Sequence, residues 1–223
     1  MTRTPAFPPR FAPVERLGSG GGGEVWTVRD RVTGELVALK TLGATGELAE
    51  ADALVREAAA LSGLEGLGVP RVLRFGRLEG GSPFLVRELV HGESLASMIE
   101  SPGDARAASR ALRAVASVAE ELTLLHRARL LHGDIKPANI IVAEDGSATL
   151  VDLGLVVAFR EAGAAAQGIT PRYAAPELFE GSPVTVRAEV FSLGRTLEDV
   201  VQAFSAELGR ETVLGLGAVA KRA

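Results

Sequence analysis

The sequence predicts an α+β fold in two lobes: a small first lobe with an antiparallel sheet and one helix, and a mostly helical second lobe. Up to about residue 90, short strand-like runs alternate with glycine turns and enclose a single helical pattern, Gly46–Leu61. After Gly92 the strand signals become rare and long helical patterns replace them. The boundary therefore falls near Leu89–Gly92, and a cleft between two such lobes is a common place for a ligand.

The first lobe is predicted to contain a strand pair, a third strand, one helix and two further strands. A glycine-rich turn divides the strand pair, and Thr33-Gly34 and Gly80-Gly81 mark further turns. The helix has an apolar stripe at positions i, i+4 and i+7. The predicted elements are the strand pair Val14–Arg29, the strand Glu35–Leu42, the helix Gly46–Leu61 with its stripe of Leu54, Ala58 and Leu61, and the strands Arg71–Phe75 and Phe84–Leu89.

The second lobe is predicted to be built around long helices. Two short strands and a loop of small residues separate the first helix from the others. The predicted helices are Asp104–Arg127, with Leu112, Val115, Ala119, Leu122 and Leu125 on its apolar face, Ala188–Phe204 and Glu211–Arg222; the strands are Ile140–Val142 and Ala148–Val151, and the loop is Ala162–Gly168. Residues 1–13 are predicted to be a disordered tail, and residues 14–223 one domain with lobes of about 14–90 and 91–223.

The composition is that of an ordinary globular protein. Of 223 residues, 47% are hydrophobic and 23% charged, and the net charge of −4 lacks the basic footprint of a nucleic-acid-binding protein. There is no cysteine and the three histidines are widely spread, which argues against disulfides and zinc sites. The proline-rich start has no signal-peptide pattern and no apolar run reaches about 18 residues, so we expect a cytoplasmic protein without a membrane span.

Glycines cluster in the turn of the first strand pair and carry the pattern G-x-G-x-x-G-x-V. Glycine lets a backbone approach phosphate groups closely and offer amide donors. The pattern alone is weak evidence, since a plain glycine hairpin also fits it. A strand rather than a helix follows the glycines, which argues against a dinucleotide-binding fold. The residues expected to contact a nucleotide here are Leu17, Gly18, Ser19, Gly20, Gly21, Gly22, Gly23 and Val25.

Lys40 lies in the third predicted strand, 22 residues after Gly18. Residues i and i+2 of a strand share a face, so Ala38 and Lys40 point the same way and could meet an adenine ring and its phosphates. A solvated edge lysine is the alternative interpretation. Glu57 argues against it, because this carboxylate lies beside the apolar stripe of its helix, where an unpaired charge is costly. We therefore predict an ion pair between Lys40 and Glu57.

The most specific segment is His132-Gly133-Asp134-Ile135-Lys136-Pro137-Ala138-Asn139. Asp134 can accept a hydroxyl proton, Lys136 can neutralise charge on a moving phosphoryl group, and Asn139 can hold a metal ion. Asp152 follows Asp134 by 18 residues and supplies a hard oxygen ligand suited to Mg²⁺. Either aspartate alone could cap a turn. Both together, in this order, indicate a phosphate-handling site.

The order of these motifs resembles the eukaryotic-type Ser/Thr protein kinases, which are also found in bacteria. The further pieces of the resemblance are Glu88 in the segment Leu85–Leu89, Asp152-Leu153-Gly154, Thr170 in a segment that resembles the substrate-docking loop, and Ala175-Pro176-Glu177. The resemblance implies a bilobal protein-kinase-like fold and transfer of the ATP γ-phosphoryl group to Ser or Thr hydroxyls of a protein substrate. The cofactors that it implies are ATP and Mg²⁺, with Mn²⁺ as an alternative ion.

The resemblance also implies a role for each matched residue. Asp134 would be the catalytic base, with Lys136, Lys40, Glu57, Asn139 and Thr170 as the other catalytic residues; Asn139 and Asp152 would bind the metal; Val25, Ala38 and Ile141 would clasp the adenine, with Glu88 and Val90 also at the nucleotide. His132 would be a packing residue rather than a proton carrier.

Several positions depart from the family pattern. Gly133 replaces the arginine that pairs with an activation-loop phosphate, and residues 155–169 contain no Ser, Thr or Tyr, so we predict activity without phosphorylation of that loop. Arg87 stands where a large apolar residue usually backs the adenine, and we expect it to turn outward. Glu189 replaces a loop-anchoring aspartate, and Gly22 replaces an aromatic residue. The second lobe is expected to be incomplete at its C-terminal end.

Two other functions stay open on the sequence alone. A pseudokinase, or an inactive fragment that binds nucleotide or docks a partner, fits Gly22, Glu189 and the early end of the chain, whereas the intact Lys40 and Asp134 argue against it. A small-molecule kinase of the aminoglycoside phosphotransferase kind shares the His-Gly-Asp motif, but the segment Thr170–Glu177 favours a protein substrate. The oligomeric state is unknown.

Overall fold

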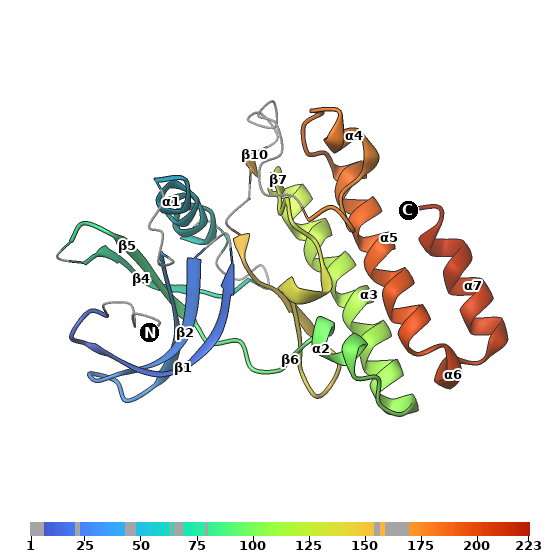
Figure 1. Cartoon of the computed structure of the whole chain (residues 1–223), viewed down its shortest axis with the longest axis horizontal. Coiled ribbons are helices and arrows are strands. Elements are labelled where there is room, and N and C mark those ends of the chain that lie inside the picture. The colour runs from blue at the N-terminus through green and yellow to red at the C-terminus, as the bar shows by residue number, and fades with distance from the viewer. Residues whose placement is uncertain are drawn as a thin grey trace. The chain divides into compact units, whose positions relative to one another are not determined.

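The computed structural model of the chain divides into two compact units, one ending at Val90 and the other beginning at His91 (Figure 1). The structure describes residues 7–20, 23–42, 48–62, 64, 69–78, 80–153, 157–158 and 170–223. The predicted loop Ala162–Gly168 lies outside these residues.

The first unit contains the predicted antiparallel sheet with one helix. The elements are β1 (Phe11–Gly20), β2 (Gly23–Asp30), β3 (Leu36–Thr41), α1 (Leu48–Ser62), β4 (Val72–Arg77) and β5 (Pro83–Glu88). The strands lie in the order β1-β2-β3-β5-β4, each antiparallel to its neighbours. β1 begins earlier than predicted because Phe11 is buried and Arg10 forms a bidentate ion pair with Asp30 on β2.

Alternation along the strands gives this sheet two different faces. One face carries a cluster of buried apolar side chains, namely Phe11, Val28, Val37, Leu39, Phe84 and Val86. Residues of the other parity, including Ala38 and Lys40, point to the opposite face. The helix α1 packs against β4 and β5, and its predicted stripe is confirmed, since Leu54, Ala58 and Leu61 are all buried.

Helices dominate the second unit, as predicted: α2 (Leu95–Glu100), α3 (Ala105–Arg127), α4 (Pro176–Phe179), α5 (Val186–Ala203), α6 (Ser205–Leu208) and α7 (Arg210–Ala220). The helix α5 packs against both α3 and α7 (Figure 1). Asp104 and Thr185 cap the N-termini of α3 and α5 by accepting backbone N–H bonds. Within the described residues, no helix is both long enough and apolar enough to cross a lipid bilayer.

Short strands complete the second unit: β6 (Glu93–Ser94), β7 (Leu130–Leu131), β8 (Ile140–Val142), β9 (Ala148–Leu150) and β10 (Val157–Ala158). β8 and β9 correspond to the two predicted short strands and pair as an antiparallel hairpin, with β6 along the other side of β8. A 3₁₀ turn, Pro137–Asn139, leads directly into β8. The short helices α2, α4 and α6 and the two-residue strands were not predicted, because such short elements have too few residues to show a hydrophobic period.

The apolar face of α3 is confirmed at Val115, Leu122 and Leu125, which are buried, but the prediction is wrong at Ala119, which is exposed. Val118 takes the core position instead. The steps of three and four residues from Val115 through Val118 to Leu122 keep the side chains on one helical face, whereas Ala119 falls beside it.

Glu121 is a buried carboxyl group on α3 that accepts a hydrogen bond from the Leu150 N–H at 2.9 Å. Burial raises its pKa from 4.5 to about 7, and the hydrogen bond from Leu150 only partly opposes this shift. The folded state therefore holds this proton more tightly than the unfolded state does. The resulting stabilisation is complete below the unfolded pKa and is lost as the pH rises through the folded pKa.

Glu121→Gln is therefore expected to be more stable than wild type at about pH 8, by up to about 3 kcal/mol, and only slightly more stable at about pH 5. Glutamine keeps an oxygen for Leu150 but carries no charge. Urea denaturation at the two pH values measures the difference, with the exposed neighbour Glu120→Gln as the matched control. A gain in the free energy of unfolding of the same size at both pH values would contradict the raised pKa of Glu121.

Candidate active site

Lys40 and Glu57 form the predicted ion pair in the first unit. Lys40 Nζ lies 2.7 Å from Glu57 Oε2, and the two side chains are only 3% and 0% exposed. β3 supplies the lysine and α1 the glutamate, so the pair joins the sheet to its helix. The other carboxylate oxygen, Glu57 Oε1, is buried and has no hydrogen-bond partner in the described part of the chain. A buried ammonium held in one orientation is suited to binding phosphate.

The glycine-rich turn closes the β1–β2 hairpin, where Gly20 lies opposite Gly23. Gly23 has a φ of +104°, and a Cβ atom at this position would lie 2.2 Å from the carbonyl oxygen of Thr41. Only glycine fits there. The other predicted contacts of this hairpin are Leu17, Gly18 and Ser19, which lie on β1, and Gly21 and Gly22, which lie outside the described residues.

Ala38 and Lys40 share one face of the sheet, as the alternation predicted, and Val25 lies on the same face. In the antiparallel register Val25 lies opposite Lys40, and Ala38 lies opposite Arg87, and directly opposite residues point to the same face. Arg87 therefore lies beside Ala38. The expectation that Arg87 turns outward is wrong, because its side chain is 5% exposed on a strand flanked on both sides by β3 and β4.

Glu88 ends β5, and Val90 lies two residues later. The Glu88 carboxylate is exposed and pairs with Arg71, whose Nε lies 2.9 Å from Glu88 Oε1. The Glu88 N–H also donates to the Arg71 carbonyl oxygen at 3.0 Å. Val90 is half-buried.

In the second unit, Asp134 lies at the centre of a cluster with Lys136, Asn139 and Thr170. Asp134 Oδ2 accepts from Lys136 Nζ at 2.5 Å and from Asn139 Nδ2 at 3.0 Å. Asp134 Oδ1 accepts from Thr170 Oγ1 at 3.1 Å, and Lys136 Nζ also donates to Thr170 Oγ1 at 3.0 Å. The structure thus brings together residues that lie up to 36 positions apart. A carboxylate beside an ammonium and a hydroxyl is suited to accepting a proton next to developing negative charge.

Glu189 of α5 holds the backbone just before Asp134. Glu189 Oε1 accepts from the Gly133 N–H at 2.7 Å, and Glu189 Oε2 lies 2.7 Å from His126 Nε2. The longer side chain thus still anchors the loop. His132 is fully buried, and its Nδ1 accepts from the Asp134 N–H at 3.3 Å. No sequence pattern pointed to His126, which lies 63 positions from its partner.

Asn139 and Asp152 lie at the same end of the β8–β9 hairpin. Ile140 lies opposite Leu150, and the Val151 N–H donates to the Asn139 carbonyl oxygen at 2.9 Å. Asp152 is the next residue and has a left-handed φ of +66°. Both hydrogen bonds of the Asn139 side chain leave from Nδ2, so Asn139 Oδ1 accepts none from the described residues.

The donor set of Asn139 and Asp152 fits Mg²⁺, since an amide oxygen and a carboxylate are both hard ligands. No group of three or more His, Cys, Asp or Glu side chains suited to a metal occurs among the residues that the structure describes. Protein oxygens from these two positions would therefore share the ion with nucleotide phosphates, a usual arrangement for Mg²⁺. Ile141, predicted to contact the adenine, lies on β8 and is half-buried.

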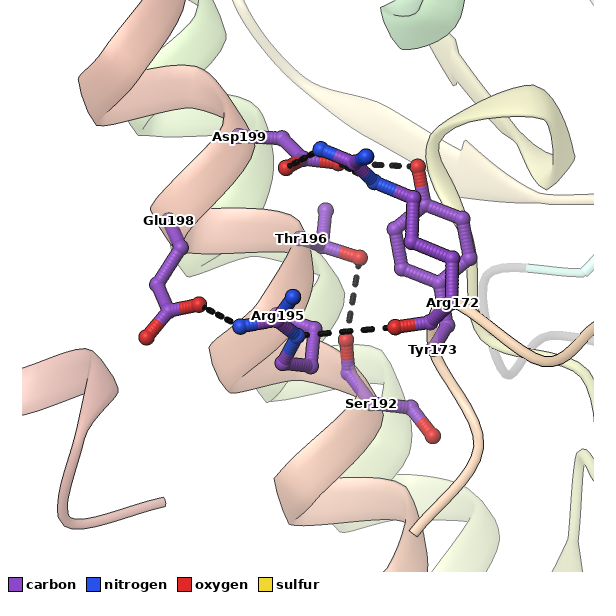
Figure 2. Close-up of polar contacts among 7 residues, drawn as sticks. All are labelled: Arg172, Tyr173, Ser192, Arg195, Thr196, Glu198 and Asp199. Atoms are coloured by element: carbon purple, nitrogen blue, oxygen red, sulfur yellow. Dashed lines mark hydrogen bonds and ion pairs between the residues drawn. The ribbon is translucent and has the colours of Figure 1, made fainter.

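The predicted substrate-docking segment is tied to α5 by ionic contacts (Figure 2). Arg172 donates through Nε and Nη2 to the two carboxylate oxygens of Asp199, at 3.0 and 2.5 Å, and the Tyr173 hydroxyl donates to Asp199 at 2.8 Å. Arg195, itself paired with Glu198, donates to the Arg172 carbonyl oxygen. Burial and the hydrogen bond to Asp199 raise the pKa of Tyr173 to about 12. Motif spacing did not point to Asp199, because its partners are distant in sequence.

The protein-family model described as "Protein kinase domain" matches residues 11–206. Similar curated proteins include bacterial kinases. Serine/threonine-protein kinase pkn2 of Myxococcus xanthus is 34% identical over 196 residues, which are 83% of this chain and 23% of that protein. Serine/threonine-protein kinase PknK of Mycobacterium tuberculosis is 34% identical over 195 residues, 84% of this chain and 17% of that protein.

A third relative, serine/threonine-protein kinase PknB of Mycolicibacterium smegmatis, is 31% identical over 214 residues, which are 90% of this chain and 34% of that protein. The chain therefore spans at most 34% of the length of these three relatives. The similarity covers most of this chain.

Proposed function

The chain belongs to the protein kinase family, and we propose that it transfers the γ-phosphoryl group of ATP to Ser or Thr hydroxyls of a protein substrate. Mg²⁺, or Mn²⁺ in its place, is the proposed metal. The observation that carries this proposal is the hydrogen-bonded cluster of Asp134, Lys136, Asn139 and Thr170. The names of the relatives support the Ser/Thr specificity.

In the proposed mechanism, Asp134 accepts the proton of the attacking hydroxyl. The Thr170 hydroxyl, which lies 3.1 Å from Asp134 Oδ1, marks where such a hydroxyl can approach the carboxylate. Lys136 Nζ lies 2.5 Å from Asp134 Oδ2 and stabilises negative charge on the transferred group. The Nδ2 group of Asn139 fixes the orientation of the carboxylate. Mg²⁺ held by Asn139 and Asp152 would neutralise phosphate charge when bound.

Lys40 is proposed to bind the nucleotide phosphates. Its ion pair with Glu57 fixes the ammonium on the face of the sheet that also carries Ala38 and Val25. Since this lysine is preorganised before the nucleotide arrives, little side-chain entropy is lost on binding. The glycine hairpin is proposed to offer backbone N–H donors to the same phosphates.

We also propose that activity needs no phosphate on the activation loop. Gly133 cannot supply a cation for such a phosphate. The docking segment instead has an internal ion pair, in which Arg172 bonds both oxygens of the buried Asp199 carboxylate. A bidentate arginine–carboxylate pair of this kind is among the stronger polar contacts in proteins, and it supports order in the segment without modification.

The test is transfer of labelled γ-phosphate from ATP to casein-like proteins and, in parallel, to a panel of aminoglycosides, with Mg²⁺ or with EDTA. The expected result is label on Ser and Thr of protein, lost in EDTA, and no label on the antibiotics. Phosphatase-treated protein, shown by mass mapping to carry no phosphate on Thr170 or Tyr173, the first hydroxyl residues after residues 155–169, is expected to keep full activity.

Two outcomes would overturn the proposal. Label on the antibiotics alone would identify a small-molecule kinase. Nucleotide binding without transfer to any acceptor would identify a pseudokinase. A phosphate on Thr170 or Tyr173 whose removal abolishes activity would overturn only the independence from loop phosphorylation.

A further inference from the structure

Arg87 is a buried cation to which the proposed mechanism gives no role. Its side chain is 5% exposed, and Nε and Nη1 are fully buried without a hydrogen-bond partner in the described part of the chain. The structure also gives this arginine no ion pair there. A buried polar group without a partner is costly, and a buried charge is more costly still. The guanidinium group is therefore expected to have a hydrogen-bond acceptor in the functional state of the protein.

The sheet register places Arg87 at the base end of the proposed nucleotide site. Lys40, proposed to bind the phosphates, lies opposite Leu85, whereas Ala38 lies opposite Arg87. Residues two positions apart on one strand are about 6.6 Å apart, which separates the phosphate end from the base end. Arg87 thus flanks Ala38, the residue proposed to cover the purine ring.

Glu57 is the obvious internal alternative as a partner, because its Oε1 is also buried and unbonded. Its other oxygen already pairs with Lys40 at 2.7 Å. That carboxylate is therefore already engaged by an ammonium group, whereas Nε and Nη1 of Arg87 have no hydrogen-bond acceptor among the described residues. A bound ligand can supply such an acceptor.

The chemistry of the guanidinium selects among purines. Arginine offers only donors, in a planar fork. A 6-oxopurine presents O6 and N7 as two adjacent acceptors, and arginine bonds this edge in bidentate fashion; adenine presents a donating amino group in place of O6. A donor-only side chain therefore matches guanine or hypoxanthine and repels the adenine amino group.

We propose that Arg87 makes this site accept 6-oxopurine nucleoside triphosphates at least as well as ATP, by donating to O6 and N7 of the base. The inference rests on the proposed phosphoryl-transfer function and extends it to the choice of nucleotide.

The experiment compares ATP, GTP and ITP in wild type, Arg87→Met, Arg87→Lys and Arg74→Met. Calorimetric titration gives the affinity of each nucleotide, and protein phosphorylation gives kcat/KM. ITP has O6 but lacks the 2-amino group of GTP. Similar affinities for GTP and ITP would therefore identify O6 as the group that the protein recognises. Arg74, exposed on β4 of the same sheet, is the matched control.

In wild type, GTP and ITP are expected to bind at least as tightly as ATP. Two affinity ratios are compared, GTP to ATP and ITP to ATP. Arg87→Met is expected to shift both ratios toward ATP by about tenfold to a hundredfold, the range expected for one bidentate base contact. Arg87→Lys is expected to shift them less, because a lysine keeps the charge without the fork. Arg74→Met is expected to leave the ratios unchanged.

Arg87→Met removes a buried guanidinium group whose Nε and Nη1 have no acceptor among the described residues, and it is expected to fold with equal or higher thermal stability. If the variant does not fold, the relative affinities of wild type for the three nucleotides still test the inference. Wild type that binds ATP at least tenfold more tightly than GTP and ITP overturns it. Equal losses for all three nucleotides in Arg87→Met would show a structural role only. Absence of transfer from every nucleotide would instead contradict the proposed function.

Discussion

Asp134→Asn is expected to slow phosphoryl transfer by about 10³-fold, within the range usual for loss of a positioned general base. The carboxylate accepts hydrogen bonds on both oxygens, from Lys136 and Asn139 on Oδ2 and from Thr170 on Oδ1. An amide at this position carries no negative charge, and its NH₂ group cannot accept. It therefore neither takes the hydroxyl proton nor pairs with the ammonium of Lys136.

The measurement is single-turnover transfer of labelled phosphate, together with nucleotide affinity by titration. The affinity is expected to change little, because Asp134 is proposed to act on the hydroxyl and not on the nucleotide. The matched control is Asp145→Asn, an exposed turn aspartate whose carboxylate accepts from the backbone N–H and the hydroxyl of Ser147, and its rate is expected to equal that of wild type. An Asp134→Asn rate within tenfold of the wild-type rate would contradict the assignment of Asp134 as the catalytic base.

Lys40→Met is expected to lose both activity and stability. Methionine is similar in size, but it leaves the Glu57 carboxylate, which is 0% exposed, without its cation. Removing one partner of a buried ion pair costs about 3–5 kcal/mol. Urea denaturation is expected to show a loss of this size, and phosphate transfer is expected to fall to background.

The double variant Lys40→Met/Glu57→Met separates the two effects. With both charges replaced by apolar side chains, much of the lost stability is expected to return, because buried ion pairs often contribute little net stability relative to apolar residues. Transfer activity is expected to stay at background, since no ammonium is left to bind phosphate. A double variant as unstable as Lys40→Met, or one with restored activity, would contradict this assignment.

The local sequence pattern was sufficient to predict which site residues meet wherever those residues are close in sequence. Strand alternation predicted that Ala38 and Lys40 share a face, and the register bears this out. The spacing of Asp134, Lys136 and Asn139 follows from a single tight turn, and their hydrogen bonds confirm that they meet. In these cases the backbone geometry of one element fixes the neighbours.

Local pattern failed for buried charges with distant partners. Glu121 occupies a core position of α3, where the hydrophobic period predicts an apolar residue, because the Leu150 N–H needs an acceptor there. Arg87 was expected outside and is buried. Hydrophobic periodicity predicts which side of an element faces the core. It does not predict which polar group on the neighbouring element needs a hydrogen-bond partner.

By itself, the sequence determined the α+β fold, the order of the main elements and the residues of the phosphate-handling motifs. Only the tertiary structure decided that His126 and Glu189 anchor the Asp134 loop, and that Arg172 and Asp199 anchor the docking segment. The physical reason is that short-range backbone preferences set each element, whereas these polar pairs join residues 27 to 63 positions apart. Such pairs form only when packing brings the elements together.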